Sequence, residues 1–435
     1  MSAKVLFFFL FLSKTSKLLK IICNFAAMKH IIGLDAKRIV RNATGLGSYG
    51  RTLVNDLLRT TADDYLFRLY APDEGREDLR QQVLQHPNLS FCYPQNVSGS
   101  KIQDSNIKGD SSLHSRASLA YPSPFTLHSS LFWRTFGIVR DLLRDGVQLY
   151  HGLSGELPVG IRKRGIKTVV TIHDLIFLRH PEYYKWIDRK IYAWKFRRTL
   201  KEADLIIAIS ECTKRDIIHY GHVPEEKIRL VYQSCSTWFK QHVGDDQRQK
   251  VNARYELPNR YVIHVGTIEE RKNILLAVQA LPLLPEDLHL VVVGRQKPYA
   301  QQVLSEARRL GVDTRLHLLQ GVPNADLPAL YQMAEACVYP SRYEGFGIPI
   351  IEAIQSGLPV VACTGSCLEE AGGPSCLYVS PDDPEALASA LLQVLKGAEG
   401  REARILQSQE YVRRFEGTDV ASQVLAIYEE LLSKR

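Results

Sequence analysis

Short runs of β-branched and other apolar residues alternate with helix-length amphipathic stretches along this chain from residue 28 onward. Two successive series of runs predict strands, at 31–35, 66–70, 89–92, 148–151, 168–172, 205–209 and 228–232, and then at 261–265, 288–293, 316–319, 336–339 and 359–362. Their spacing of roughly 20 to 30 residues suits a strand, a crossover helix and two loops. The alternation predicts an α/β chain whose parallel sheets carry helices on both faces.

The 435 residues exceed what one hydrophobic core usually holds, so more than one domain is expected. A polar stretch at 240–259 separates the two series of strands. We therefore predict a first domain over residues 28–240, a second over 255–415 and a terminal helical segment over 416–435. Residues 95–124, rich in Ser, Asn, Gly and Asp, predict a surface loop in the first domain.

The composition excludes several classes of protein. Hydrophobic residues make up 45% and charged residues 23%, which is typical of a soluble globular protein and not of a disordered, collagen-like or multi-span membrane protein. Half of the net charge of +8 comes from Lys4, Lys14, Lys17 and Lys20, so the bulk of the chain lacks the basic face of a nucleic-acid-binding protein. Attraction to an anionic membrane surface or to phosphate ligands stays open.

The N-terminal stretch and the cysteines bear on location. The apolar run at 5–12 is too short to span a bilayer, and lysines interrupt it as a signal peptide. We expect the working protein to begin at Met28, with residues 1–27 dispensable. The eight cysteines show no C-x-x-C spacing, which predicts reduced thiols in a cytoplasmic protein and no metal site.

The most specific segment follows the predicted strand 336–339 and contains two glutamates, Glu344 and Glu352. Pro349 suits the first turn of a helix and Gly357 suits its end. Glu344 then lies on a glycine-rich loop and Glu352 on the helix, beside free backbone amides. Such a site suits a ligand that is rich in hydroxyls and carries phosphate, although the spacing alone equally allows two solvated surface acids.

This segment resembles the signature of retaining nucleotide-sugar glycosyltransferases with the GT-B fold, and within them most the bacterial mannosyltransferases of polysaccharide and lipopolysaccharide assembly. The resemblance continues in Gly45-Leu46-Gly47, Thr171-Ile172-His173-Asp174-Leu175, Ala203-Asp204, Ser210-Glu211, Gly266-Thr267-Ile268-Glu269-Glu270-Arg271-Lys272-Asn273 and Glu370-Ala371-Gly372. It implies two Rossmann-like domains facing each other across a cleft, with the second domain binding the donor. It also implies that segment 416–435 packs back on the first domain.

The resemblance implies roles for individual residues. We expect Glu344, His173, Lys272 and Arg271 to be catalytic. The family often has Arg directly after the glycine, where Thr267 stands here, so Arg271 is the less regular of the two cations. The residues expected to bind the donor are Gly47, Gly266, Phe346, Gly347, Ile348, Ile351 and Glu352. His173 ends a predicted strand, from which it would orient a sugar hydroxyl or share a proton.

Two segments keep alternative interpretations. Residues 45–50 formally read G-x-G-x-x-G, the dinucleotide fingerprint, but Gly45 follows Asp35 too distantly for that motif, and a simple turn before a helix near Tyr49 is also open. Residues 183–201 mix aromatic and basic side chains. They predict either a helix at an anionic membrane surface or an amphipathic helix that buries its aromatic residues.

The predicted function is retaining transfer of a hexose, mannose from GDP-mannose by first choice, to a glycan or lipid-linked glycan at the inner face of the cytoplasmic membrane. The alternatives are a UDP-sugar donor, a Rossmann oxidoreductase, an epimerase, or a non-catalytic nucleotide-sugar-binding protein.

No metal cofactor is expected, because the sequence contains no D-x-D segment to hold a cation. Arg271 and Lys272 would instead stabilise the charge on the leaving phosphate. We therefore predict that turnover persists in excess EDTA. A complete loss of turnover that only manganese or magnesium restores would contradict this.

Overall fold

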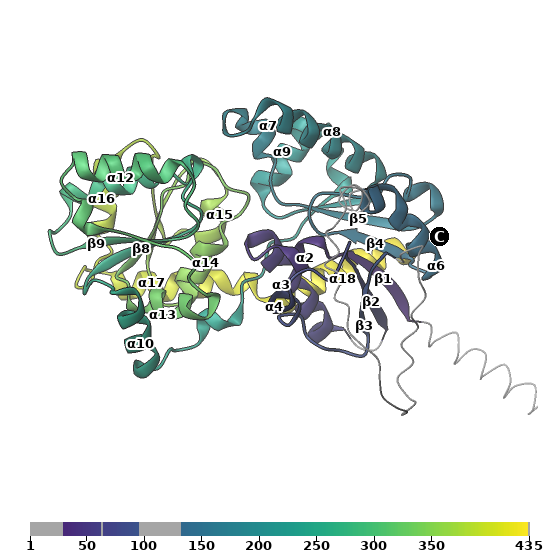
Figure 1. The fold of residues 1–435 in the computed structure, drawn as a ribbon, viewed down its shortest axis with the longest axis horizontal. Coiled ribbons are helices and arrows are strands. Elements are labelled where there is room, and N and C mark those ends of the chain that lie inside the picture. Colours follow the sequence, from purple (N-terminus) through teal and green to yellow (C-terminus); the bar gives the residue numbers. More distant parts are fainter. Residues whose placement is uncertain (1–28, 62–63, 95–131, 434–435) are drawn as a thin grey trace, which may run out of the picture.

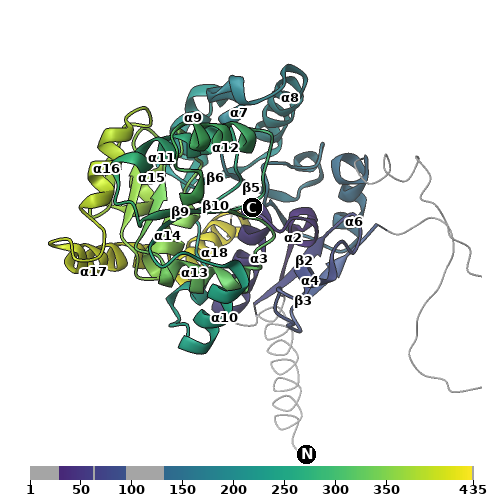
Figure 2. The same ribbon diagram turned by 60° about the vertical axis from the view of Figure 1, so that its left-hand side comes forward.

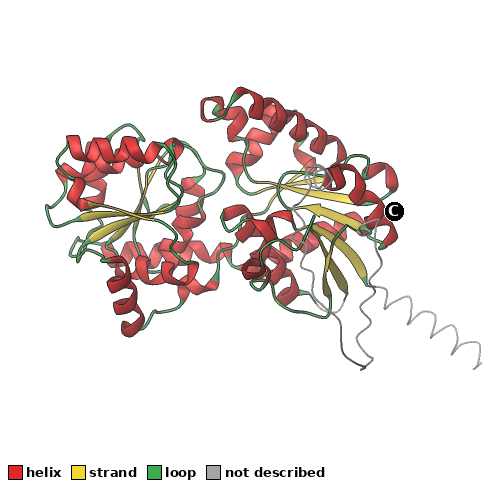
Figure 3. Ribbon diagram, viewed as in Figure 1, coloured by secondary structure: helices red, strands yellow, loops and turns green. Residues whose placement is uncertain are grey.

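The structure is a computed structural model that describes residues 29–61, 64–94 and 132–433. Two parallel sheets, each covered by helices on both faces, lie one beside the other along the long axis of the molecule (Figures 1 and 3). The prediction of an α/β fold with two Rossmann-like domains is confirmed. The predicted extension 1–27 and the predicted loop 95–124 lie outside the described residues.

The first domain contains a seven-stranded sheet with the order β3-β2-β1-β4-β5-β6-β7. Its strands are β1 (His30–Asp35), β2 (Tyr65–Tyr70), β3 (Leu89–Cys92), β4 (Leu149–Gly152), β5 (Lys167–Ile172), β6 (Leu205–Ala208) and β7 (Ile228–Leu230). Its helices are α2 (Lys37–Arg41), α3 (Gly45–Thr60), α4 (Glu77–Arg80), α6 (Ile138–Arg144), α7 (Ile176–Arg179), α8 (Trp186–Glu202) and α9 (Glu211–Gly221). A π-helical turn, η1 (Trp133–Gly137), leads into α6.

The second domain contains a six-stranded sheet with the order β10-β9-β8-β11-β12-β13. Its strands are β8 (Tyr261–Val265), β9 (His289–Val293), β10 (Leu316–Leu319), β11 (Ala336–Tyr339), β12 (Val360–Cys363) and β13 (Leu377–Val379). Its helices are α10 (Asp245–Tyr255), α11 (Ile274–Ala280), α12 (Tyr299–Arg309), α13 (Leu327–Met333), α14 (Ile348–Gln355), α15 (Leu368–Gly372), α16 (Pro384–Leu392) and α17 (Arg401–Tyr411).

Every predicted strand is present, with ends that differ by at most two residues. The central strands β6, β11 and β12 are buried along their whole length, because helices cover both faces of a parallel sheet. Among the strands of the described residues, only β13 was not predicted. Its three residues are half-buried at the edge of the sheet, so they form neither an apolar run nor an alternating pattern.

Helix α10 lies in the polar stretch that separates the two predicted series of strands. It packs on α13 of the second domain, where Arg254 and Tyr255 donate to the Asp326 carboxylate at 2.8 and 2.7 Å. Val251 of α10 belongs to the same hydrophobic core as Leu330 of α13. The second domain therefore takes in residues from 245 onward.

The last helix, α18 (Gly417–Ser433), returns to the first domain and packs against α3 (Figures 1 and 2). Its stripe of Val420, Val424 and Tyr428 lies in the core with Leu53 and Leu57. The Tyr428 hydroxyl is 2.7 Å from His151 Nδ1 at the end of β4. The terminal helix thus joins the two domains. In the part of the chain that the structure describes, no helix is both long and apolar enough to cross a membrane.

Candidate active site

The carboxyl ends of two neighbouring strands bring the predicted catalytic carboxylate and both predicted cations together. Glu344 follows β11, and Arg271 and Lys272 follow β8, which pairs with β11. Glu344 Oε2 lies 2.7 Å from Arg271 Nη1, and Glu344 Oε1 lies 2.6 Å from Lys272 Nζ. Two separate sequence motifs therefore meet in one ion cluster.

The cluster keeps Glu344 ionised although only 8% of the residue is exposed. Burial by itself would raise the pKa of Glu344, but the charges of Arg271 and Lys272 outweigh burial and lower it to about 2. Burial lowers the pKa of Lys272, and the charge of Glu344 opposes that shift. Glu269 pairs with both Arg271 and Lys297, so these five side chains carry a net charge of +1. The cluster can accept a further anion.

Both cations are fixed by additional contacts. Arg271 donates to the Tyr343 carbonyl at 2.6 Å and to Glu269 at 2.9 Å. Lys272 donates to the Tyr339 hydroxyl at 2.7 Å and lies 5.0 Å from the centre of that ring. Cations held in this way need little reorganisation when negative charge develops beside them.

The glycine-rich loop after Glu344 leads directly into helix α14. Gly347 caps this helix with φ of +121°, a conformation that side chains disfavour, and Pro349 occupies the first turn as predicted. The Cys367 thiol donates to the Phe346 carbonyl at 2.9 Å and thereby holds the loop in place. Pro349 has no amide hydrogen, and the Ile350 amide donates to the Gly347 carbonyl at 2.9 Å, which leaves the Ile348 amide at the helix start. The start of a helix favours a negatively charged ligand.

Three of the predicted donor-binding residues lie around this helix start. Phe346 is buried, and its ring centroid is 5.4 Å from that of Tyr232 and 5.2 Å from that of Phe415. Ile351 is fully buried, whereas Ile348 is partly exposed. Phe346 and Ile351 thus serve the core with their side chains, so a ligand contact at Phe346 would come from its backbone.

Glu352 lies in α14, eight residues after Glu344 in the sequence, and its environment differs from that of the ion cluster. Its carboxylate accepts from the Tyr331 hydroxyl at 3.1 Å. Burial raises the pKa of Glu352 to about 7, because no cation offsets the loss of solvation and the Tyr331 hydrogen bond opposes it only in part. The pKa of Glu344 is therefore lowered, which favours its ionised form, whereas the pKa of Glu352 is raised, which favours its protonated form.

His173 follows β5 in the first domain, at the edge of the sheet where it was predicted. Its Nε2 lies 2.8 Å from the Leu153 carbonyl, and its Nδ1 lies 2.7 Å from Gln233 Nε2. The carbonyl requires the proton on Nε2, so Nδ1 accepts from Gln233. Burial lowers the pKa of His173 to about 4. Both ring nitrogens form hydrogen bonds within the protein, so the neutral ring is fixed in place. Neither nitrogen is left to exchange a proton with a substrate.

Two predicted glycines are required by packing inside the protein. Gly47 lies in the first turn of α3, which begins at Gly45 and is separated from β1 by α2. A Cβ on Gly47 would lie 1.8 Å from the Asn42 carbonyl oxygen, and its amide already donates to Thr44 at 2.9 Å. Residues 45–50 are therefore neither a dinucleotide loop nor a turn before a later helix. At Gly266 a Cβ would lie 3.0 Å from His264 Nε2, which is tighter than an ordinary contact.

The site lies where the two domains touch. A Cβ on Gly345 would lie 2.1 Å from the His173 carbonyl oxygen, so the glycine loop rests directly on the end of β5. Tyr343 donates to Asp216 of α9 at 2.6 Å. The Glu370 carboxylate accepts from the amides of Glu211 and Cys212, the first residues of α9, at 2.6 and 3.0 Å.

Several residues of the site were not predicted, namely Tyr339, Tyr343, Gln233 and Glu269. Tyr339 ends a strand whose neighbours were assigned, so its position at the sheet edge was a usable signal. Gln233 and Tyr343 act through partners that are 60 and 127 residues away in the sequence, and no local pattern marks them. Among the described residues no group of histidine, cysteine, aspartate and glutamate side chains is arranged to hold a metal ion.

Comparisons with known proteins agree with this architecture. Residues 245–410 match the family model described as glycosyl transferases group 1, and residues 105–237 match glycosyltransferase family 4. The chain is 30% identical over 289 residues to O-antigen chain mannosyltransferase B of Escherichia coli, covering 65% of this chain and 74% of the relative. It is 28% identical over 257 residues to O-antigen chain mannosyltransferase RfbU of Salmonella typhimurium, covering 59% and 67%. Anabaena HepE, solved in complex with UDP, has a TM-score of 0.65 and 17% identity over 93% of this chain and all of its own.

The two motif glutamates should affect stability in opposite ways as pH changes. The pKa of Glu352 is raised to about 7, so the fold loses stability as pH rises through about 7 and this residue becomes charged. Glu352→Gln should therefore gain on the wild type between about pH 6 and pH 8.5, by about 1.4 kcal/mol in the free energy of unfolding.

Glu344→Gln is the matched comparison. The pKa of Glu344 is lowered to about 2, so its charge stabilises the fold at neutral pH, and that contribution fades only as pH falls from 4.5 towards 2. This variant should be less stable than the wild type at both pH values. Urea unfolding of the three proteins measures the differences. An unchanged Glu352→Gln difference between the two pH values would show that Glu352 is not held neutral.

Proposed function

Because the chain belongs to the glycosyl transferases group 1 family, it is a glycosyltransferase, and we propose that it transfers a hexose from a nucleoside diphosphate to a glycan with retention of configuration. We propose mannose from GDP-mannose as the donor and polysaccharide synthesis as the setting, because both relatives are O-antigen chain mannosyltransferases. The observation that carries the proposal is Glu344, held between Arg271 and Lys272 at the contact between the domains.

The two cations are proposed to stabilise the leaving group. When the bond between the anomeric carbon and the phosphate oxygen breaks, negative charge develops on the terminal phosphate. Arg271 and Lys272 are fixed, carry the positive charge of the cluster and adjoin the glycine loop. Part of their pairing with Glu344 would pass to the phosphate oxygens, and Glu344 would then face the positive charge that develops on the sugar ring.

The acceptor's proton is proposed to pass to the departing phosphate. The acceptor hydroxyl oxygen would bond to the anomeric carbon on the face that the phosphate leaves, which retains the configuration. The state of His173 supports this route, because both of its ring nitrogens are occupied and its pKa is lowered to about 4. His173 is then a positioning residue that shapes the site, and it does not act as a general base.

Glu352 is proposed to bind the ribose of the nucleotide. It lies on a helix next to a sheet edge, where acids grip ribose hydroxyls in other α/β folds. Its partner Tyr331 leaves carboxylate lone pairs for two hydroxyl donors. A UDP-sugar is the second candidate donor, since the structure of HepE, which shares the fold, contains UDP. The free thiols of the described cysteines fit a cytoplasmic enzyme.

Binding experiments should distinguish the roles of the two glutamates. Glu352→Gln should weaken binding of both GDP and GDP-mannose, because the ribose contact is common to both ligands. Glu344→Gln should leave GDP binding nearly intact while turnover falls, because Glu344 is assigned to the transferred sugar. Calorimetric titration of both variants with GDP and with GDP-mannose, together with turnover, measures these effects.

Glu385→Gln, which alters an exposed glutamate on α16, is the control and should match the wild type. Titration of the wild type with UDP and UDP-glucose decides between the two donor classes. If Glu344→Gln loses GDP binding and Glu352→Gln keeps it, the assigned roles are reversed and the proposed placement of the donor fails.

A further inference from the structure

Helix α8 presents large apolar side chains to solvent. Trp186 is 66% exposed, Ile187 is 63% exposed and Trp194 is 53% exposed, and Ile191 is exposed as well. The residues that α8 buries are Phe196, Thr199 and Leu200. The sequence left open whether this segment buries its aromatic residues, and the structure shows that both tryptophans remain outside.

Most of the exposed residues share one face of the helix, here called the outer face, whereas Tyr192, which is 42% exposed, lies outside it. At about 100° per residue, one sector of about 140° contains four apolar and four basic residues and no acid. The outer face consists of Trp186, Ile187, Lys190, Ile191, Trp194, Arg197, Arg198 and Lys201. The two acids of the helix, Asp188 and Glu202, fall outside this sector. Figures 1 and 2 both show α8 at the surface of the first domain, with no element of the described chain covering it.

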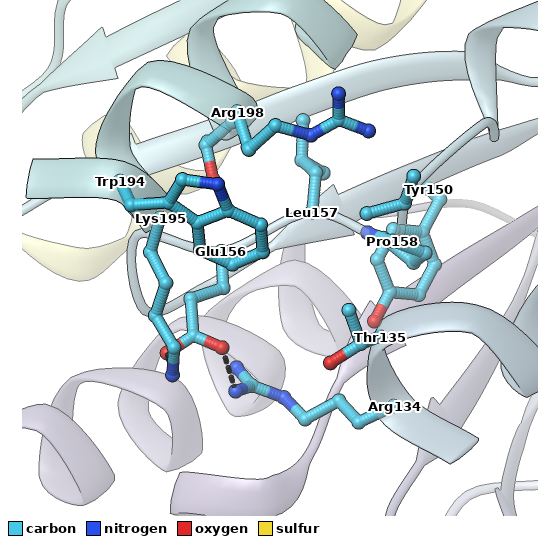
Figure 4. Close-up of a pocket in the computed structure, with 11 residues that line it drawn as sticks. Arg134, Thr135, Tyr150, Glu156, Leu157, Pro158, Trp194, Lys195 and Arg198 are labelled. Atoms are coloured by element: carbon cyan, nitrogen blue, oxygen red, sulfur yellow. Dashed lines mark hydrogen bonds and ion pairs between the residues drawn. The ribbon is translucent and has the colours of Figure 1, made fainter. Parts of the chain in front are cut away.

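The neighbouring turn η1 adds to this surface. Phe132 is 65% exposed and Phe136 is 47% exposed, and their ring centroids lie 5.2 Å apart. One pocket is bordered by both elements, with Arg134 and Thr135 of η1 on one side and Trp194, Lys195 and Arg198 of α8 on the other (Figure 4). The turn η1 and helix α8 therefore lie side by side at the surface of the first domain.

The charges inside this pocket are paired, and Arg198, which also borders it, lies 4.0 Å from Glu202. Arg134 pairs with Glu156 (Figure 4), which in turn lies 3.1 Å from Lys195. Arg134 also contacts Asp35 at 2.5 Å. On the outer face, Lys190 lies 5.7 Å from the centre of the Trp186 ring, and it forms a cation–π contact with that tryptophan. Lys190, Arg197 and Lys201 of the outer face are exposed and are placed to meet an external negative charge.

We propose that the outer face of α8 binds the surface of an anionic lipid bilayer. A basic helix that interleaves Trp and Ile with Lys and Arg matches the interface of a bilayer, where apolar groups enter the boundary region and cations meet anionic head groups. A nucleic acid would use the cations but would leave Ile187 and Ile191 in water. The bilayer satisfies both kinds of side chain at once, which is why we prefer it as the partner.

Docking in this way bears on the proposed function, although it does not depend on it. The chain immediately before α8 lies against the domain contact, where His180 and the Tyr343 ring are 4.8 Å apart. A bilayer held against α8 would therefore lie near the contact between the domains, where the candidate active site is. An acceptor anchored in the membrane would then reach the site without leaving the lipid.

Sedimentation of the full chain with lipid vesicles tests the proposal. The wild type should bind vesicles that contain about a third phosphatidylglycerol in phosphatidylcholine, and should bind pure phosphatidylcholine vesicles much more weakly. Lys190→Gln, Arg197→Gln and Lys201→Gln combined should weaken binding to the anionic vesicles about 100-fold, since each basic residue contributes roughly a factor of five. Trp186→Ser with Trp194→Ser should weaken it at least about tenfold.

Matched controls lie on the second domain. Lys250→Gln, Arg308→Gln and Lys396→Gln combined remove the same charge from exposed positions, and Leu406→Ser removes an equally exposed apolar side chain. Both controls should bind as the wild type does. Equal loss in the controls and in the α8 variants, equal binding to neutral and anionic vesicles, or no binding of the wild type would each overturn the proposal.

Tryptophan fluorescence gives an independent reading, because the chain has only four tryptophans and two are on this face. Anionic vesicles with brominated acyl chains should quench the wild type and should quench the double tryptophan variant much less. GDP binding measured without lipid shows that each variant is folded. It also separates the two proposals, since a protein that binds vesicles but no nucleotide would contradict the function and not the docking.

Discussion

Glu344 carries a full negative charge at a place where little water reaches it, and Arg271 and Lys272 make that charge stable. A buried charge that loses a partner destabilises a protein by roughly 3–5 kcal/mol, so the three residues form a unit. Their approach depends on the pairing of β8 with β11, because the two loops leave neighbouring strands at the same edge. The order of strands in the sheet thus positions the three side chains of the ion cluster.

The loop that carries Glu344 packs against the first domain, and this contact limits how the two domains can open. Gly345 rests on the His173 carbonyl with no room for a side chain, and Glu370 accepts two amide hydrogen bonds at the start of α9. Hydrogen bonds to a charged group contribute about 1.5–3 kcal/mol each. Any opening of the two domains to admit a donor or release a product must therefore break the Glu370 contacts, while α18 keeps the domains joined.

Much of this arrangement was predictable from the sequence, and for a definite reason. Strands buried on both faces appear as unbroken apolar runs, so β6, β11 and β12 were readable, whereas the half-buried edge strand β13 was not. Glu344 and Lys272 were predictable because each follows such a strand within a recognisable motif. Gln233, Tyr343 and Glu370 contact residues that are distant in the sequence, and pairings of that kind leave no local pattern.

Helix α8 and Gly47 show two other limits. An amphipathic helix with aromatic residues has the same sequence pattern whether they face a core or a membrane, and only the exposed fractions of Trp186 and Trp194 decide between these. Gly47 stands in a motif that suggested a ligand, yet the backbone of Asn42 already explains why no side chain fits there. A glycine indicates a close approach whether the neighbour is a ligand or the protein backbone, and the sequence does not say which.

The central claim is that the cations beside Glu344 stabilise the departing diphosphate, and the turnover of Lys272→Ala tests it most directly. Losing one such fixed donor raises the barrier by about 3–4 kcal/mol, so we predict a fall in turnover of two to three orders of magnitude. Folding is checked by urea unfolding, and Lys272→Arg should restore part of the activity. Turnover of Lys272→Ala close to that of the wild type would contradict the account.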